Sequence, residues 1–149
     1  MLNVPLHPLL VHFPIAFLVI GTLFAIISIW RRDFFDKGAF FMISFGVLSG
    51  IIAYLSGDGA ERFASTHWGN GYRKLVGIHQ LYATMTLLLF GSAVGIRLLF
   101  SFYKRKILIP IVAICCLLGS GALAMTGHYG GQMVYVQKHA VPAQTTNQP

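Results

Sequence analysis

Residues 9–30 read LLVHFPIAFLVIGTLFAIISIW, an apolar stretch of 22 residues. About 20 apolar residues suffice for an α-helix to cross the hydrocarbon core of a bilayer. In lipid, such a segment must satisfy its backbone hydrogen bonds internally, which favours a helix. Three further stretches of 20 to 22 residues follow it. The sequence therefore predicts an all-α transmembrane four-helix bundle, with helices at residues 9–30, 38–57, 75–96 and 107–126.

The composition of the whole chain agrees with a membrane location. Of its 149 residues, 56% are hydrophobic and only 10% are charged, and the mean hydropathy is +0.70. A soluble domain carries about 25% charged residues. The length suits one domain, which we assign to residues 1–141, and the polar, Pro/Gln/Thr-rich tail at 142–149 is expected to be disordered. The lipid bilayer is thus the first predicted partner.

Basic residues mark one side of the predicted bundle. Positively charged side chains concentrate in loops that stay in the cytoplasm. Seven of them lie in or next to the two short loops, and four lie on the opposite side. We therefore expect an up-down-up-down bundle with both termini and the 58–74 segment outside. The seven are Arg31, Arg32, Lys37, Arg97, Lys104, Arg105 and Lys106, and the four are Arg62, Arg73, Lys74 and Lys138.

Three other features narrow the class of protein. The net charge of +7 sits mostly at the ends of the apolar stretches, so we expect no nucleic-acid partner. The first stretch ends in Trp30-Arg31-Arg32 rather than in a small-residue cleavage site, so it should remain as a membrane anchor. Cys115 and Cys116 are adjacent and lack CxxC or CxxCH spacing, which argues against a zinc ribbon and a c-type haem.

All six histidines fall at or beyond the outer end of the predicted helices. His7 lies just before the first helix, and His12 lies about one turn inside it. His79 lies one turn into the third helix, and His128 follows the fourth. Ionisable groups at membrane depth are by default functional candidates, so we predict that these four bind a metal or a haem. The alternative for each one alone is an imidazole that rests in the headgroup region.

The neighbours of these histidines support the prediction. Pro14 has no N–H to donate to the carbonyl of Leu10, which leaves a free acceptor beside His12. The face of the third helix that begins at His79 continues through Ala83, Thr86 and Phe90.

Small residues lie beneath His128 in the fourth helix. Gly121, Ala124 and Gly127 leave room for a flat ligand, and we predict that Gly127 contacts it. The alternative is that Gly127, Gly130 and Gly131 form a helix C-cap and a turn. At the same end of the bundle we expect Arg73 to neutralise haem propionates. Arg62 and Lys74 are the other candidates for this role. The alternative for these cations is a role in solubility and topology.

The choice of ligand depends on what accompanies the imidazoles. Imidazole binds zinc, copper and iron alike. A zinc site usually adds a carboxylate, and the only outer acids, Asp58 and Glu61, lie in a predicted turn at 56–61. A bis-histidine haem needs only two imidazoles on facing helices and an apolar slot. We therefore favour haem b, one or two per chain, with ligands paired across helices rather than between His7 and His12.

The opening HPLLVHFPIA, the histidine of the third helix and the closing GHYGGQMVY resemble a widespread bacterial family of small predicted membrane proteins of unknown function. The resemblance runs from His7 to about Val141. In that family the domain is also joined to Rieske or cytochrome c modules, which implies electron transfer, a b-type haem and a bacterial inner membrane. Two histidines stay outside the ligand set: His139, and His67, which we interpret as an interfacial anchor beside Trp68.

The favoured function is a b-type cytochrome that relays electrons near the outer, periplasmic face. It would be an electron carrier with no catalytic residue of its own, and its partner would be a cytochrome c or a Rieske protein. One alternative is a cofactor-free accessory subunit that holds a partner, or forms an oligomer, through small-residue faces. Another is a copper- or zinc-binding membrane protein. The small residues concerned are Gly46, Gly50, Gly91, Gly95, Gly119, Gly121 and Ala122.

Overall fold

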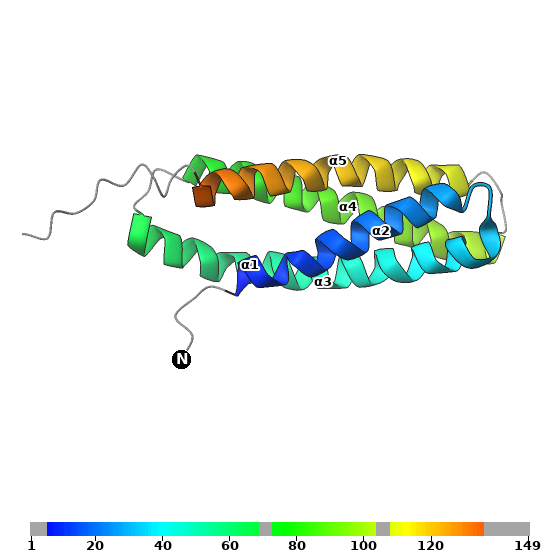
Figure 1. Ribbon diagram of the computed structural model, residues 1–149, viewed down its shortest axis with the longest axis horizontal. Coiled ribbons are helices and arrows are strands. Elements are labelled where there is room, and N and C mark those ends of the chain that lie inside the picture. The colour runs from blue at the N-terminus through cyan, green and yellow to red at the C-terminus, as the bar shows by residue number, and fades with distance from the viewer. Residues whose placement is uncertain (1–5, 69–72, 104–107, 136–149) are drawn as a thin grey trace, which may run out of the picture.

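The second, third and fourth predicted helices run past their apolar stretches, whereas the first ends at Ile27, before the end of its stretch. The computed structural model describes residues 6–68, 73–103 and 108–135, and the side chains of all of these except 63–68 and 100–103. Four segments are long and apolar enough to cross a membrane, which confirms the predicted helical bundle (Figure 1). The helices are α1 (His7–Leu10), α2 (His12–Ile27), α3 (Arg32–Trp68), α4 (Arg73–Tyr103) and α5 (Leu108–Tyr135), with α1 and α2 together forming the first crossing.

The turn predicted at 56–61 and the alternative of a C-cap and turn at Gly127, Gly130 and Gly131 are both wrong. Residues 56–61 are helical, because α3 continues to Trp68 through a segment that has no proline and contains alanine, glutamate and arginine, all good helix formers. Gly127, Gly130 and Gly131 also lie inside a helix, since α5 continues to Tyr135. Glycine is tolerated in helices that cross a membrane.

Proline shapes the start of the bundle. The helix is interrupted at Val11, between α1 and α2. Pro14 cannot donate to the carbonyl of Leu10, and regular bonding resumes where the N–H of Ile15 donates to the Val11 carbonyl at 3.3 Å. His7 begins α1 and is not outside the helix as predicted. In Figure 1, α2 then crosses α3 obliquely.

The bundle consists of two hairpins packed side by side. The first hairpin is α1–α3 and the second is α4–α5, and they meet where α2 packs against α5 and α3 against α4. Leu18, Phe90 and Cys116 are fully buried at the centre. Close approach depends on glycine there: a Cβ at Gly46 would lie 2.5 Å from Leu18, and one at Gly119 would lie 2.7 Å from Phe90. By contrast, Gly91, Gly95 and Gly121 have open space where a Cβ would be.

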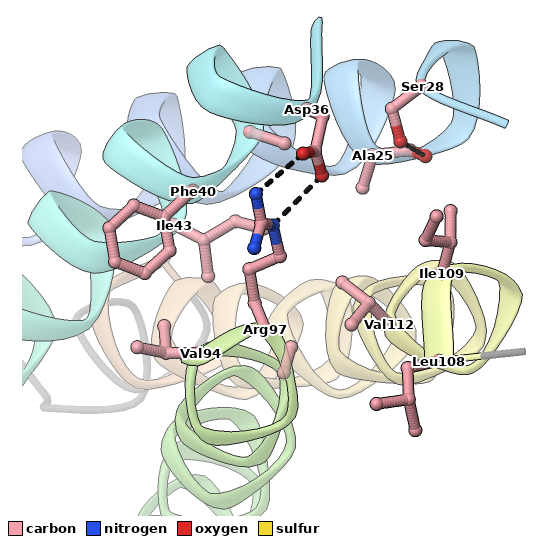
Figure 2. A pocket seen from close by; sticks show the side chains of 12 residues that line it. Ala25, Ser28, Asp36, Phe40, Ile43, Val94, Arg97, Leu108, Ile109 and Val112 are labelled. Carbon is pink, nitrogen blue, oxygen red and sulfur yellow. Dashed lines mark hydrogen bonds and ion pairs between the residues drawn. The ribbon is translucent and has the colours of Figure 1, made fainter. Parts of the chain in front are cut away.

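An ion pair joins the two hairpins at the end of the bundle that holds the α2–α3 turn. Arg97 of α4 donates from Nε and Nη2 to the two carboxylate oxygens of Asp36 of α3, at 2.9 and 2.6 Å (Figure 2). Beside it lies a cavity of about 20 Å³, which Ser28 also lines. From the sequence, Arg97 counted only as one of the basic residues that set the orientation of the bundle. The structure adds its contact with Asp36.

Candidate metal centre

Two of the four predicted ligands meet inside the bundle. His7 of α1 and His79 of α4 are both partly buried, and their ring centroids lie 6.3 Å apart. The ring planes are inclined by 79° to each other. One imidazole comes from each hairpin, so the pair spans the boundary between the hairpins.

The hydrogen bonds of His7 define which ring nitrogen carries the proton. Its Nδ1 lies 2.9 Å from the carbonyl oxygen of Ala53 and 2.9 Å from Oγ of Ser56, both on α3. The Ser56 hydroxyl donates its only hydrogen to the Ala53 carbonyl at 2.6 Å, so towards His7 it accepts. Both partners therefore require an N–H at Nδ1. In the neutral ring this leaves a lone pair on Nε2.

His79 is held in the same way by α5. Its Nδ1 lies 2.9 Å from the carbonyl oxygen of Thr126, which can only accept, so this Nδ1 also donates. Gly130 lies against the ring, and a Cβ there would be 3.3 Å from Cε1 and 3.4 Å from Nδ1 of His79. Next to this contact, Tyr82 and Tyr129 stack with centroids 5.6 Å apart and planes inclined by 15°.

The buried face that leads down from His79 was predicted correctly. Thr86 is 4% exposed and Phe90 is completely buried, so this side of α4 points into the bundle. The Thr86 hydroxyl lies 3.5 Å from that of Thr126, the residue whose carbonyl holds His79. The orientation of α4 therefore directs His79 inwards.

His12 and His128 lie apart from this pair. Both are exposed, and the side-chain amide nitrogen of Gln132 donates to Nε2 of His128 at 2.9 Å. Within the described ranges, no three histidine, cysteine, aspartate or glutamate side chains come close enough to hold a metal ion. His139 and the side chain of His67 fall outside the described residues.

The other predicted cofactor contacts lie at the surface. Arg73 is the first residue of α4 and is exposed. Gly127 is also exposed, and no side chain lies within 4 Å of where its Cβ would be. The slot predicted along Gly121, Ala124 and Gly127 therefore faces outwards from the bundle.

Ser56 and Gly130 were not among the site residues predicted from the sequence. A signal for Ser56 was present, since Ala53 and Ser56 are three residues apart within the predicted helix 38–57 and share a helix face. For Gly130 the signal was its place beside Tyr129 in GHYGG, but the sequence does not show which glycine of that motif turns towards α4.

Residues 3–143 match the model of a family described as "Predicted membrane protein (DUF2231)". No curated protein and no solved structure gave a match to the chain.

Proposed function

This chain belongs to that family of predicted membrane proteins, whose function is unknown, and we propose that it is a b-type cytochrome holding one haem between His7 and His79. The haem would lie near the outer, periplasmic face of a bacterial inner membrane. There it would exchange electrons with a periplasmic redox protein such as a cytochrome c or a Rieske protein.

The separation of the two rings carries the proposal. An imidazole nitrogen binds a first-row metal ion at about 2 Å, and the ring centre lies roughly 1 Å behind that nitrogen. Two imidazoles on opposite sides of one ion therefore have centres about 6 Å apart. The centroids of His7 and His79 are 6.3 Å apart. The observed separation therefore matches that of two imidazoles that share one ion.

The hydrogen bonds of the pair support ligation by Nε2. Histidine ligands commonly donate the other ring N–H to a carbonyl, which fixes the tautomer and the orientation of the ring. His7 does so to Ala53, and His79 does so to Thr126. His128 differs, because its Nε2 already accepts a hydrogen bond from Gln132.

The number of ligands favours haem over a bare ion. A structural zinc site takes four protein ligands, and a catalytic one takes three. His7 and His79 are joined by no third histidine, cysteine or acid among the described residues. Haem would need only two imidazoles from the protein, which His7 and His79 would provide, and when bound it would supply one-electron transfer. The chain's own part is to fix the two rings and to shield them within the bundle.

The visible spectrum of the detergent-purified protein tests the proposal. We expect a Soret band and sharp α and β bands after reduction with dithionite, with about one haem per chain by pyridine haemochrome. His7→Ala and His79→Ala should each lose the haem or make it five-coordinate. His128→Ala is the matched control, because it removes an exposed imidazole at the same end of the bundle, and it should keep the spectrum.

Other outcomes would support the alternatives. A protein without a Soret band that contains stoichiometric copper or zinc would be a metal-binding protein. A protein with neither would fit a cofactor-free subunit. Haem that survives both His7→Ala and His79→Ala unchanged would refute this ligand assignment.

A further inference from the structure

We infer that Ser56 and Gly130 are positioning residues that hold the imidazole planes of His7 and His79 nearly perpendicular. The inference rests on the proposed function and adds to it the geometry of ligation. The observed angle between the planes is 79°. Neither residue would touch the iron, and each would act through one histidine.

Ser56 fixes the plane of His7 through a shared acceptor. The Ser56 hydroxyl and the Nδ1–H of His7 both point at the carbonyl of Ala53, and the same Nδ1–H also meets Ser56 Oγ. Two acceptors on one N–H restrict rotation of the ring about its bond to Cβ more than a single acceptor would. Without the Ser56 oxygen, His7 would keep the Ala53 contact and gain freedom to turn.

Gly130 fixes the plane of His79 by allowing close approach. The ring lies where a methyl group on residue 130 would be only 3.3–3.4 Å from two of its atoms. A Cβ at this site would therefore displace the ring by a few tenths of an ångström or turn it. Because Nδ1 is held by the carbonyl of Thr126, turning would pivot about that hydrogen bond and change the angle to His7.

The angle between axial imidazoles has a spectroscopic signature. In low-spin ferric haem, each imidazole plane raises the energy of one of two iron d orbitals. Parallel planes act on the same orbital and separate the two energies, which produces a rhombic three-line electron paramagnetic resonance spectrum. Perpendicular planes act on different orbitals and leave the energies nearly equal, which produces one dominant large-g feature.

The test compares the ferric holo-protein with four variants. We expect the large-g feature in the unaltered protein and its shift towards a rhombic spectrum in Ser56→Ala and Gly130→Ala. Ser49→Ala is the matched control for α3, because the Ser49 hydroxyl donates to Phe45 and Gly46. Gly131→Ala is the control for α5, because a Cβ there has open space. Both controls should keep the large-g feature.

The outcomes separate this inference from the proposed function. A haem with a rhombic spectrum in the unaltered protein, or one whose spectrum is unchanged in both Ser56→Ala and Gly130→Ala, would overturn the inference and leave the cytochrome in place. Absence of haem would refute the cytochrome. In that case nitrogen-15 magnetic resonance of the haem-free protein tests whether Ser56 positions the His7 ring. We expect Nδ1–H tautomers for both rings and an upfield shift of the His7 Nδ1–H proton in Ser56→Ala. No shift would overturn the role of Ser56.

Discussion

Replacement of Phe90 by alanine distinguishes two contributions to the stability of this bundle. One is close packing of the core, and the other is transfer of apolar side chains out of water. Phe90 is completely buried in the core to which both hairpins contribute, and it lies against Gly119. Phe→Ala costs about 3–5 kcal/mol in soluble cores, part of it from transfer of the side chain out of water. In a bilayer the transfer contribution largely disappears, because lipid tails are as apolar as the core. A residual cavity of about 100 Å³ at about 24 cal/mol per Å³ leaves roughly 2.4 kcal/mol.

We therefore expect Phe90→Ala to lower the free energy of unfolding by about 2–3 kcal/mol, measured by reversible unfolding in mixed micelles. Gly119→Ala should also destabilise, because its Cβ would lie 2.7 Å from the Phe90 ring. In the double variant the new methyl group occupies part of the cavity. The double variant should therefore lose less free energy of unfolding than the sum of the losses in the two single variants. A Phe90→Ala loss under about 1 kcal/mol, or additive losses, would refute this account of the core.

Three further predictions concern the hairpins and their orientation. Asp36→Asn should lower the free energy of unfolding by about 1–3 kcal/mol in the same assay, because Arg97 loses a charged acceptor for two hydrogen bonds. An unchanged free energy of unfolding would show that the ion pair contributes nothing. Thr22→Val should cost only about 0.6 kcal/mol through loss of its 3.0 Å hydrogen bond to α5, and a loss above about 2 kcal/mol would contradict that estimate. A cysteine introduced after residue 33 should be protected from an impermeant thiol reagent in intact cells, whereas one near residue 70 should be labelled, and the reverse pattern would place the histidines in the cytoplasm.

Hydropathy predicted the number of crossings because each polar group placed in lipid carries a large free-energy cost. A segment that crosses the membrane must therefore be apolar along its length. Hydropathy did not predict where the helices end, since a helix outside the hydrocarbon core depends on propensity and contacts rather than on apolarity. Residues 58–68 continue α3 for that reason. Hydropathy also did not single out Ser56 and Gly130, because their role depends on which side chain of another helix lies against them.

The sequence indicated which histidines deserve attention but not how they pair. His7 and His12 are five residues apart, which on a regular helix turns their side chains about 140° away from each other. Only one of them can then face the interior, and the interruption at Val11 adds a change of direction. That His7 meets His79 depends on how two hairpins dock, a long-range relation that no local spacing reports.

The two imidazoles that meet belong to different hairpins, and this has a consequence for biogenesis. A nascent chain completes α1–α3 before α4 has left the ribosome. Each hairpin can enter the bilayer with its own backbone hydrogen bonds satisfied. Neither hairpin alone presents both rings, so a ligand that needs both can be captured only after the second hairpin docks. If the chain binds haem as proposed, haem binding would be the last step of its maturation, and chains whose hairpins fail to dock would lack haem.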